Sequence, residues 1–202
     1  TYLMTGQSFC MLRPEFLKLR AASLLKRSKF HDIKCIFINF GSTDPTNVTA
    51  KIISTLSKVK LNSEMSIVVA NTPHLREIKN CISTFPGKIN LIVDATNMSE
   101  LMYQADLAIG AAGATTWERC ALGLPTIIIK TAENQNTVIK RIIEFDVAVL
   151  HDLDTENQPV ELLKHLSYIQ ENYLYMSEKC SDLVQGDGVS KVVDRMLRCK
   201  NK

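Results

Sequence analysis

Six short apolar runs recur along the middle of the chain, and segments with the apolar spacing of helices separate them. The runs are CIFINF, MSIVVA, INLIVD, DLAIGA, PTIIIK and VAVLH, at residues 35–40, 65–70, 89–94, 106–111, 125–130 and 147–151. Short continuous runs rich in β-branched residues are typical of strands that are buried on both faces. Because they alternate with helices, they predict a doubly wound, Rossmann-like α/β fold with a parallel sheet of about six strands.

The segments on either side of this region have helical patterns without strand-like runs. Residues 159–202 predict two or three closing helices. Near the start, MLRPEFLKLRAASLLKR predicts an entering segment and a helix with a basic, solvated face that includes LLKR. We therefore expect residues 1–31 to form an interdomain linker and entering helix, and residues 32–202 to form one domain.

Composition narrows the class of protein. The 202 residues are 46% hydrophobic and carry a net charge of +3, without Lys/Arg clusters interleaved with aromatics, which disfavours nucleic-acid binding. There is no run of about 18 apolar residues and no secretory leader pattern, so we expect a soluble, cytoplasmic protein without stable membrane insertion. The chain begins with Thr1, which leaves open that it is processed or is cut from a longer protein.

Cysteine and histidine spacing gives no sign of a metal centre. The six cysteines include no CxxC pair, and the four histidines show no HExxH or comparable ligand spacing. Several cysteines lie within apolar segments, which favours small buried thiols in a reducing compartment over disulfides. We expect no bound metal and no cofactor.

The loop GSTDPTN follows the first predicted strand and has the composition of an anion-binding turn. In an open α/β sheet, ligands bind beyond the carboxyl ends of the strands. Gly41 permits close backbone approach, and a helix that starts near Pro45 or Thr46 offers N–H groups to a phosphate. The alternative is an ordinary helix cap, in which Asp44 or Thr46 caps a helix that begins at Asn47.

The stretch GAAGATTWE, residues 110–118, follows the fourth predicted strand and is the stronger candidate. Its small residues let the backbone pass close to a ligand, Thr115 and Thr116 offer hydroxyl and N–H groups, and Glu118 lies within reach of a vicinal diol. Alternatively, Glu118 only favours the start of its helix through the dipole. The stretch is not GxGxxG and lacks the acidic residue of a nicotinamide ribose site, which disfavours a dehydrogenase.

Three segments together carry a family resemblance: FGSTDPTN, MSELMYQADLAIGAAGATTWERCALGLPTIII and ENQ. They resemble the C-terminal domain of glycosyltransferase-B proteins of the MurG type. They are most similar to the UDP-sugar hydrolase PseG of pseudaminic acid biosynthesis and its relatives in spore-coat and surface polysaccharide pathways. MLRPEF resembles the segment through which those proteins pass from their first domain to their second.

The resemblance implies a UDP or UDP-sugar site. It places Glu118 on the ribose hydroxyls, and Asn134 with Gln135 toward the sugar. It places two loops beside the diphosphate, and these consist of Gly41, Ser42, Thr43, Ala112, Gly113, Ala114, Thr115 and Thr116. It places Ala95 and Met98 at the uracil pocket.

The resemblance also implies that the catalytic histidine belongs to an N-terminal Rossmann-like domain that does not precede Thr1 here; His31 and His151 do not match it. Three hypotheses follow from these residues. The first is the UDP-binding domain of a hydrolase that cleaves UDP from a 2,4-diacetamido-trideoxy hexose, inactive by itself. The second is the same domain of a transferase that passes the sugar to an acceptor. The third is a non-catalytic interaction module that keeps the nucleotide-binding fold.

Overall fold

The computed structural model describes residues 3–200, apart from the side chains of residues 199 and 200, and it confirms the predicted fold class. Six parallel strands form one sheet in the order β3-β2-β1-β4-β5-β6. The strands are β1 (Cys35–Asn39), β2 (Glu64–Val69), β3 (Ile89–Val93), β4 (Leu107–Gly110), β5 (Thr126–Ile129) and β6 (Ala148–His151). Each lies within one or two residues of a predicted run.

Helices follow the strands in the expected rhythm. They are α1 (Pro14–Arg27), α2 (Val48–Leu56), α3 (Leu75–Ser83), α4 (Met98–Gln104), α5 (Thr115–Ala121), α6 (Asn136–Glu144), α7 (Gln158–Glu171), α8 (Tyr173–Leu183) and α9 (Gly188–Lys200), with 3-10 turns η1 (Gln7–Phe9) and η2 (Glu133–Gln135). Three helices, α7 to α9, therefore close the chain. Within residues 3–200, no helix combines the length and the apolar character needed to cross a membrane.

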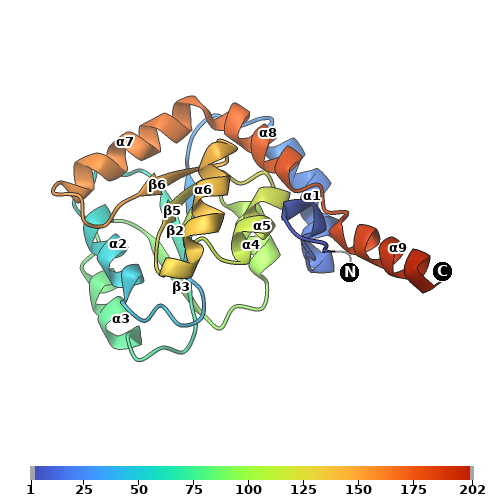
Figure 1. Ribbon diagram of the computed structural model, residues 1–202. Helices are drawn as coiled ribbons and strands as arrows, with labels where there is room; N and C mark the ends of the chain where they lie inside the picture. Colours follow the sequence, from blue (N-terminus) through green and yellow to red (C-terminus); the bar gives the residue numbers. More distant parts are fainter. Residues whose placement is uncertain (1–2, 201–202) are drawn as a thin grey trace.

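Alternate side chains of each strand enter different packing clusters, so both faces of the sheet are covered. On β1, Ile36 and Ile38 pack with α2, α3 and α7, whereas Phe37 packs with α1 and α4 on the other face. Ile128 of β5 packs with α5, α6 and α8. Figure 1 shows α2 and α3 on one side of the sheet and α4 and α5 on the other. This two-sided burial explains why the strands appear in the sequence as continuous apolar runs.

Helix α1 ends in a buried arginine, which corrects the prediction that LLKR is a solvated face. Arg27 is 2% exposed. Its guanidinium donates to the carbonyl oxygens of Leu122, Ala105 and Met102 and to the Tyr173 hydroxyl, at 2.7 to 3.1 Å. The carbonyl groups at the ends of α4 and α5 have no partner within their own helices, and Arg27 supplies one.

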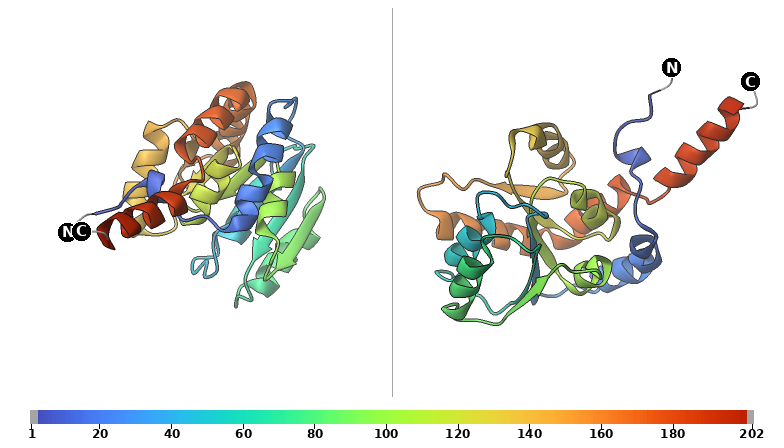
Figure 2. Two further views of the ribbon diagram at one scale, coloured as in Figure 1. Left: turned by 90° about the vertical axis from the view of Figure 1, so that its right-hand side faces the viewer. Right: turned by 90° about the horizontal axis from the view of Figure 1, so that it is seen from below.

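The N-terminal segment and α9 lie side by side and extend from the body of the molecule (Figure 2). Helix α9 has a strongly amphipathic pattern, yet Val193, Met196 and Leu197 are exposed. Gly188, the first residue of α9, lies against the backbone of Cys10, so closely that a Cβ atom would come within 2.2 Å of the Cys10 carbonyl oxygen. This backbone contact fixes where α9 starts.

Candidate functional site

The strand order reverses between β1 and β4, and the predicted site loops follow these two strands. Asn39 and Gly110, the last residues of β1 and β4, are register partners. The strand order on one side runs to β2 and β3, and on the other to β5 and β6. A crevice for a ligand forms at such a switch point in doubly wound sheets. The two candidate loops are thus brought together, although the register partners Asn39 and Gly110 are 71 positions apart in the sequence.

The first loop is folded around Asp44, which caps α2. Its carboxylate accepts from the backbone N–H groups of Val48 and Thr49, at 2.8 and 3.0 Å, and from the Thr49 hydroxyl at 2.7 Å. Asn47 accepts from the N–H of Ala50 at 3.3 Å. The helix begins at Val48, one residue later than expected. The capping interpretation is confirmed, and these first-turn N–H groups are occupied rather than free for a phosphate.

Gly41, Ser42 and Thr43 follow the carboxyl end of β1 and are exposed. Gly41 has a φ of 87°, which favours glycine, and its N–H donates to the Asn39 side chain at 3.3 Å. The Asn39 amide in turn donates to the carbonyl of Val68 at 2.9 Å. The loop is therefore anchored to β1 and β2, with its hydroxyl residues toward solvent.

The glycine-rich stretch makes a tight turn between β4 and α5. The N–H of Thr116 donates to the Gly113 carbonyl at 3.0 Å. Before it, the N–H groups of Gly113, Ala114 and Thr115 have no acceptor among the described residues. Gly113 is exposed, with open space where a side chain would be. Three consecutive backbone donors beside open space suit an anionic ligand.

Arg119 lies behind this turn, and the sequence analysis missed it. It is 1% exposed, and its Nη2 donates to the Ala111 carbonyl at 2.7 Å and to the Thr116 hydroxyl at 3.0 Å. Burial lowers the pKa of Arg119 to about 10, so the guanidinium stays protonated at neutral pH. The sequence gave no signal that Arg119 turns inward, because α5 is too short to show which of its faces is buried.

Glu118 is held by Arg13, from the segment that precedes α1. Arg13 Nε and Nη2 lie 3.1 and 3.0 Å from Glu118 Oε1. Glu118 Oε2 is buried and accepts no hydrogen bond from the described residues. Burial raises the pKa of Glu118, and the hydrogen bond and charge of Arg13 oppose the rise. One carboxylate oxygen is thus covered and has no hydrogen-bond partner among the described residues.

The other predicted residues follow β3, the outermost strand on one side, and β5, the neighbour of β4. Ala95 and Met98 are half-buried beside α4 and pack against the cluster that contains Phe37. Asn134 is exposed on η2. Gln135 holds its own loop, because its amide both accepts from the Thr131 N–H at 3.0 Å and donates to the Thr131 hydroxyl at 2.9 Å.

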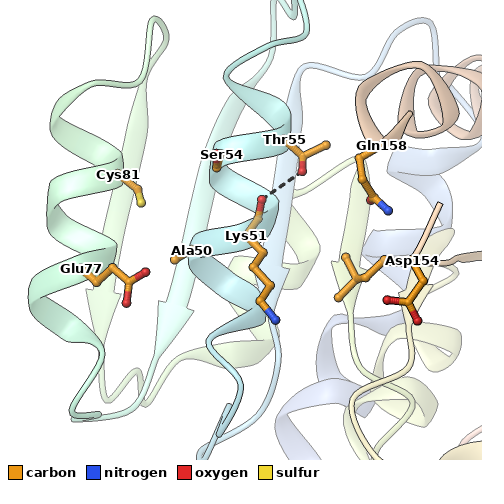
Figure 3. A pocket seen from close by; sticks show the side chains of 9 residues that line it. Ala50, Lys51, Ser54, Thr55, Glu77, Cys81, Asp154 and Gln158 are labelled. Carbon is orange, nitrogen blue, oxygen red and sulfur yellow. Dashed lines mark hydrogen bonds between the residues drawn. The ribbon is translucent and has the colours of Figure 1, made fainter. Parts of the chain in front are cut away.

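Two surface hollows lie on the side of the molecule that carries α2 and the segments after β5 and β6. One of about 530 Å³ lies between α2, α3 and the segment before α7; Figure 3 shows Lys51 of α2 extending toward the side on which Asp154 lies. A second, of about 690 Å³, lies at the ends of β5 and β6 beside Lys130 and His151. The predicted site residues line neither hollow. Among the described side chains, none gather as three or more metal ligands.

A family model described as the glycosyltransferase family 28 C-terminal domain matches residues 35–191. The chain belongs to this family. The match runs from β1 into α9 and includes both loops at the switch point. The family assignment and the sheet topology agree with the coarser part of the resemblance, to the C-terminal domain of MurG-type glycosyltransferase-B proteins.

Three relatives indicate the range of the family. An uncharacterised protein of Methanocaldococcus jannaschii is 26% identical over 208 residues, which cover all of this chain and 39% of that protein. The spore coat polysaccharide biosynthesis protein SpsG of Bacillus subtilis is 25% identical, over 95% of this chain and 57% of SpsG. The third is a UDP-N-acetylglucosamine–N-acetylmuramyl-(pentapeptide) pyrophosphoryl-undecaprenol N-acetylglucosamine transferase of Helicobacter acinonychis. It is 31% identical over 54% of this chain and 34% of its own length. The chain thus spans about 40 to 60% of the first two relatives.

Solved structures show the same fold. MurG of Acinetobacter baumannii superposes with a TM-score of 0.72 at 18% identity, over 87% of this chain and 53% of MurG. The UDP-GlcNAc 2-epimerase of Neisseria meningitidis, bound to UDP-GlcNAc, gives 0.61 at 15% identity, over 91% of this chain and 52% of that one. The family 28 domain is therefore a glycosyltransferase-B-like α/β domain in this chain as well.

Proposed function

We propose that this chain is the UDP-binding domain of a nucleotide-sugar enzyme in surface polysaccharide biosynthesis. One observation carries the proposal. In a family 28 domain, three consecutive backbone N–H groups without acceptors, at Gly113 to Thr115, lie at the switch point of the sheet. The helix that follows carries Glu118, whose Oε2 is buried and has no hydrogen-bond partner among the described residues.

The proposed roles follow from these donors and acceptors. The N–H groups from Gly113 to Thr115, helped by the exposed loop 41–43, bind the diphosphate oxygens. The Glu118 carboxylate accepts hydrogen bonds from the ribose hydroxyls. The uracil lies beside Ala95 and Met98, and the sugar extends toward Asn134. The domain stabilises charge on the departing diphosphate, and it needs a second domain for proton transfer.

For the reaction, we propose hydrolysis of a UDP-sugar, in which water attacks the sugar carbon or the phosphorus. The similarity to SpsG along 95% of the chain supports a role in polysaccharide biosynthesis. Transfer of the sugar to an acceptor is the second candidate, supported by the 31% identity with the Helicobacter transferase over 121 residues. Analysis of products formed by a two-domain protein, with and without an acceptor, distinguishes free sugar from a glycosylated acceptor.

The first experiment is calorimetric titration of this chain with UDP, with ADP as the comparison. Saturable binding of UDP and not ADP is expected. Glu118→Gln keeps the side-chain shape and removes the charge, so the ribose hydrogen bonds weaken and the affinity for UDP falls about tenfold. The same change is expected to leave the affinity for inorganic pyrophosphate unaltered.

Glu133→Gln is the matched control. Glu133 is an exposed acid on η2, on the same edge of the sheet, and it pairs only with Lys130 and Asn136 among the described residues. Unaltered UDP affinity in both variants would remove Glu118 from the site. Failure of the unaltered chain to bind UDP would contradict the proposal and favour the non-catalytic module.

A further inference from the structure

Arg119 is a buried cation that is only partly satisfied. Nη2 makes both of its hydrogen bonds, to the Ala111 carbonyl and the Thr116 hydroxyl. Nε and Nη1 are buried and have no acceptor among the side chains and backbone that the structure describes. A guanidinium carries five N–H donors, and burying unpartnered donors is costly. The fold keeps this arrangement directly beneath the turn that ends β4.

The other fully buried arginine, Arg27, makes four hydrogen bonds with its five N–H donors. Arg27 uses Nε, Nη1 and Nη2, and its partners are three carbonyl oxygens and the Tyr173 hydroxyl. A guanidinium with a purely structural role can thus have all three of its nitrogens hydrogen-bonded here, mostly to carbonyls at helix ends. In Arg119 only one of the three nitrogens is hydrogen-bonded to the described residues, although the side chain is buried to the same degree.

No acidic side chain between residues 3 and 198 forms an ion pair with Arg119. The neighbouring acid, Glu118, is paired with Arg13 instead. Arg13 pairs with Glu15 as well, at 3.1 Å, so both acids near the turn have Arg13 as their cation and Arg119 has no counter-ion among the described side chains. A buried charge without a counter-ion is strongly destabilising, so an anion that approaches the turn removes part of that cost.

Gly110 fixes the guanidinium close to the backbone of the turn. A Cβ atom at this position would come within 2.2 Å of Arg119 Nη1 and 2.6 Å of the Asn39 carbonyl oxygen. Only glycine lets Nη1 occupy this space between the ends of β4 and β1. The cation therefore lies beneath the switch point, and its bond to Ala111 holds that carbonyl back from the exposed side of the turn.

We propose that Arg119 is the buried positive charge of the diphosphate site, with a positioning role: it fixes the turn 110–116 and attracts the diphosphate without touching it. The assignment rests on the proposed function. In a site with little water, a fixed cation beneath the backbone donors strengthens anion binding. It should contribute to affinity for the diphosphate and not to affinity for the nucleoside.

The test compares UDP, uridine and inorganic pyrophosphate as ligands of three folded variants. Arg119→Met keeps the length of the side chain and removes the charge. We expect it to bind UDP and pyrophosphate at least about tenfold more weakly and uridine unchanged. Arg119→Lys keeps the charge and is expected to recover most of the affinity. Lys51→Met removes one positive charge from an exposed position on α2 and is expected to change none of the three affinities.

A second measurement needs no loss of the cation. The Nε–H signal of Arg119 is assigned in the 15N NMR spectrum of the unaltered chain as the arginine signal that is missing from the spectrum of Arg119→Lys. It should shift when UDP or pyrophosphate is added and not with uridine. The Nε–H signal of Arg27, which donates to the Leu122 carbonyl, should stay in place. This measurement stands even where Arg119→Met does not fold.

The outcomes separate this assignment from the proposed function. Failure of the unaltered chain to bind UDP or pyrophosphate overturns both. Binding by the unaltered chain with equal losses for UDP and uridine in Arg119→Met makes Arg119 a structural residue and overturns the assignment alone. Unchanged UDP affinity in that variant, or an Arg119 signal that ignores UDP, has the same result.

Discussion

At the scale of single residues, the partners of a polar side chain decide its role. Asp44 could be placed in the sequence only as part of a loop that suits either a phosphate or a helix cap. In the structure its carboxylate is 7% exposed and is committed to three donors of α2. Asp44 has a φ of 31°, a conformation that Asp and Asn tolerate better than most residues. These contacts make it a structural residue of the edge that carries the site.

Asp44→Asn should therefore destabilise the fold and leave the ligand site intact. The amide keeps the shape and the backbone conformation, but it offers one acceptor oxygen in place of two. We expect the free energy of unfolding in urea to fall by about 1 to 2 kcal/mol. Asp32→Asn, the same change at an exposed position before β1, should leave it within about 0.5 kcal/mol. A loss of UDP affinity in folded Asp44→Asn would assign Asp44 to the site instead.

At the scale of elements, β6 and α7 are joined by two histidines. The rings of His151 and His165 meet edge to face, with centroids 5.4 Å apart. Burial lowers the pKa of both, the positive charge of His151 lowers that of His165 further, and Glu161 opposes both shifts. In the unfolded chain the pKa of a histidine is about 6.5, and in the folded protein the pKa of each of these two histidines lies below that value. The unfolded chain binds more protons in acid, so this pair costs stability as the pH falls through about 6.5.

His165→Asn should lessen that acid sensitivity. We expect the difference in free energy of unfolding between pH 7.5 and pH 5.5 to be smaller in the variant than in the unaltered chain. His31→Asn, at an exposed position, provides the matched comparison and should leave the difference unchanged. An equal pH dependence in all three proteins would show that the buried pair does not control acid stability.

The elements themselves could be predicted more fully than their contacts. All six strands were found because burial on both faces leaves a continuous apolar run. The burial of Arg27 was missed, because LLKR has the same letters whether its arginine meets water or the ends of two helices. The pairing of Arg13 with Glu118 was equally hidden, since 105 residues separate the two. Local patterns specify strands and loops, whereas contacts between distant segments require the assembled fold.

At the scale of the whole molecule, Arg27 connects segments that are far apart in the chain. It leaves α1 and reaches the ends of α4 and α5, at Met102, Ala105 and Leu122, and Tyr173 at the start of α8. Tyr173 stacks on Phe30, with ring centroids 3.4 Å apart. The entering helix is thereby tied to α4, to α5 and to the closing helix α8 through one side chain.

Arg27→Met should accordingly weaken the whole fold rather than release α1 alone. It removes one hydrogen bond from each of three buried carbonyls and from one hydroxyl, although Leu122 and Ala105 keep Ser23 and Lys26 as donors. We expect a loss of about 3 kcal/mol in the free energy of unfolding. Far-UV circular dichroism and the fluorescence of Trp117 on α5, the single tryptophan, should shift together in denaturant. Lys18→Met, the same loss of charge on the exposed side of α1, should shift neither signal. An unchanged Trp117 transition with partial loss of helix would mean that α1 detaches separately, and that Arg27 serves this helix and not the molecule.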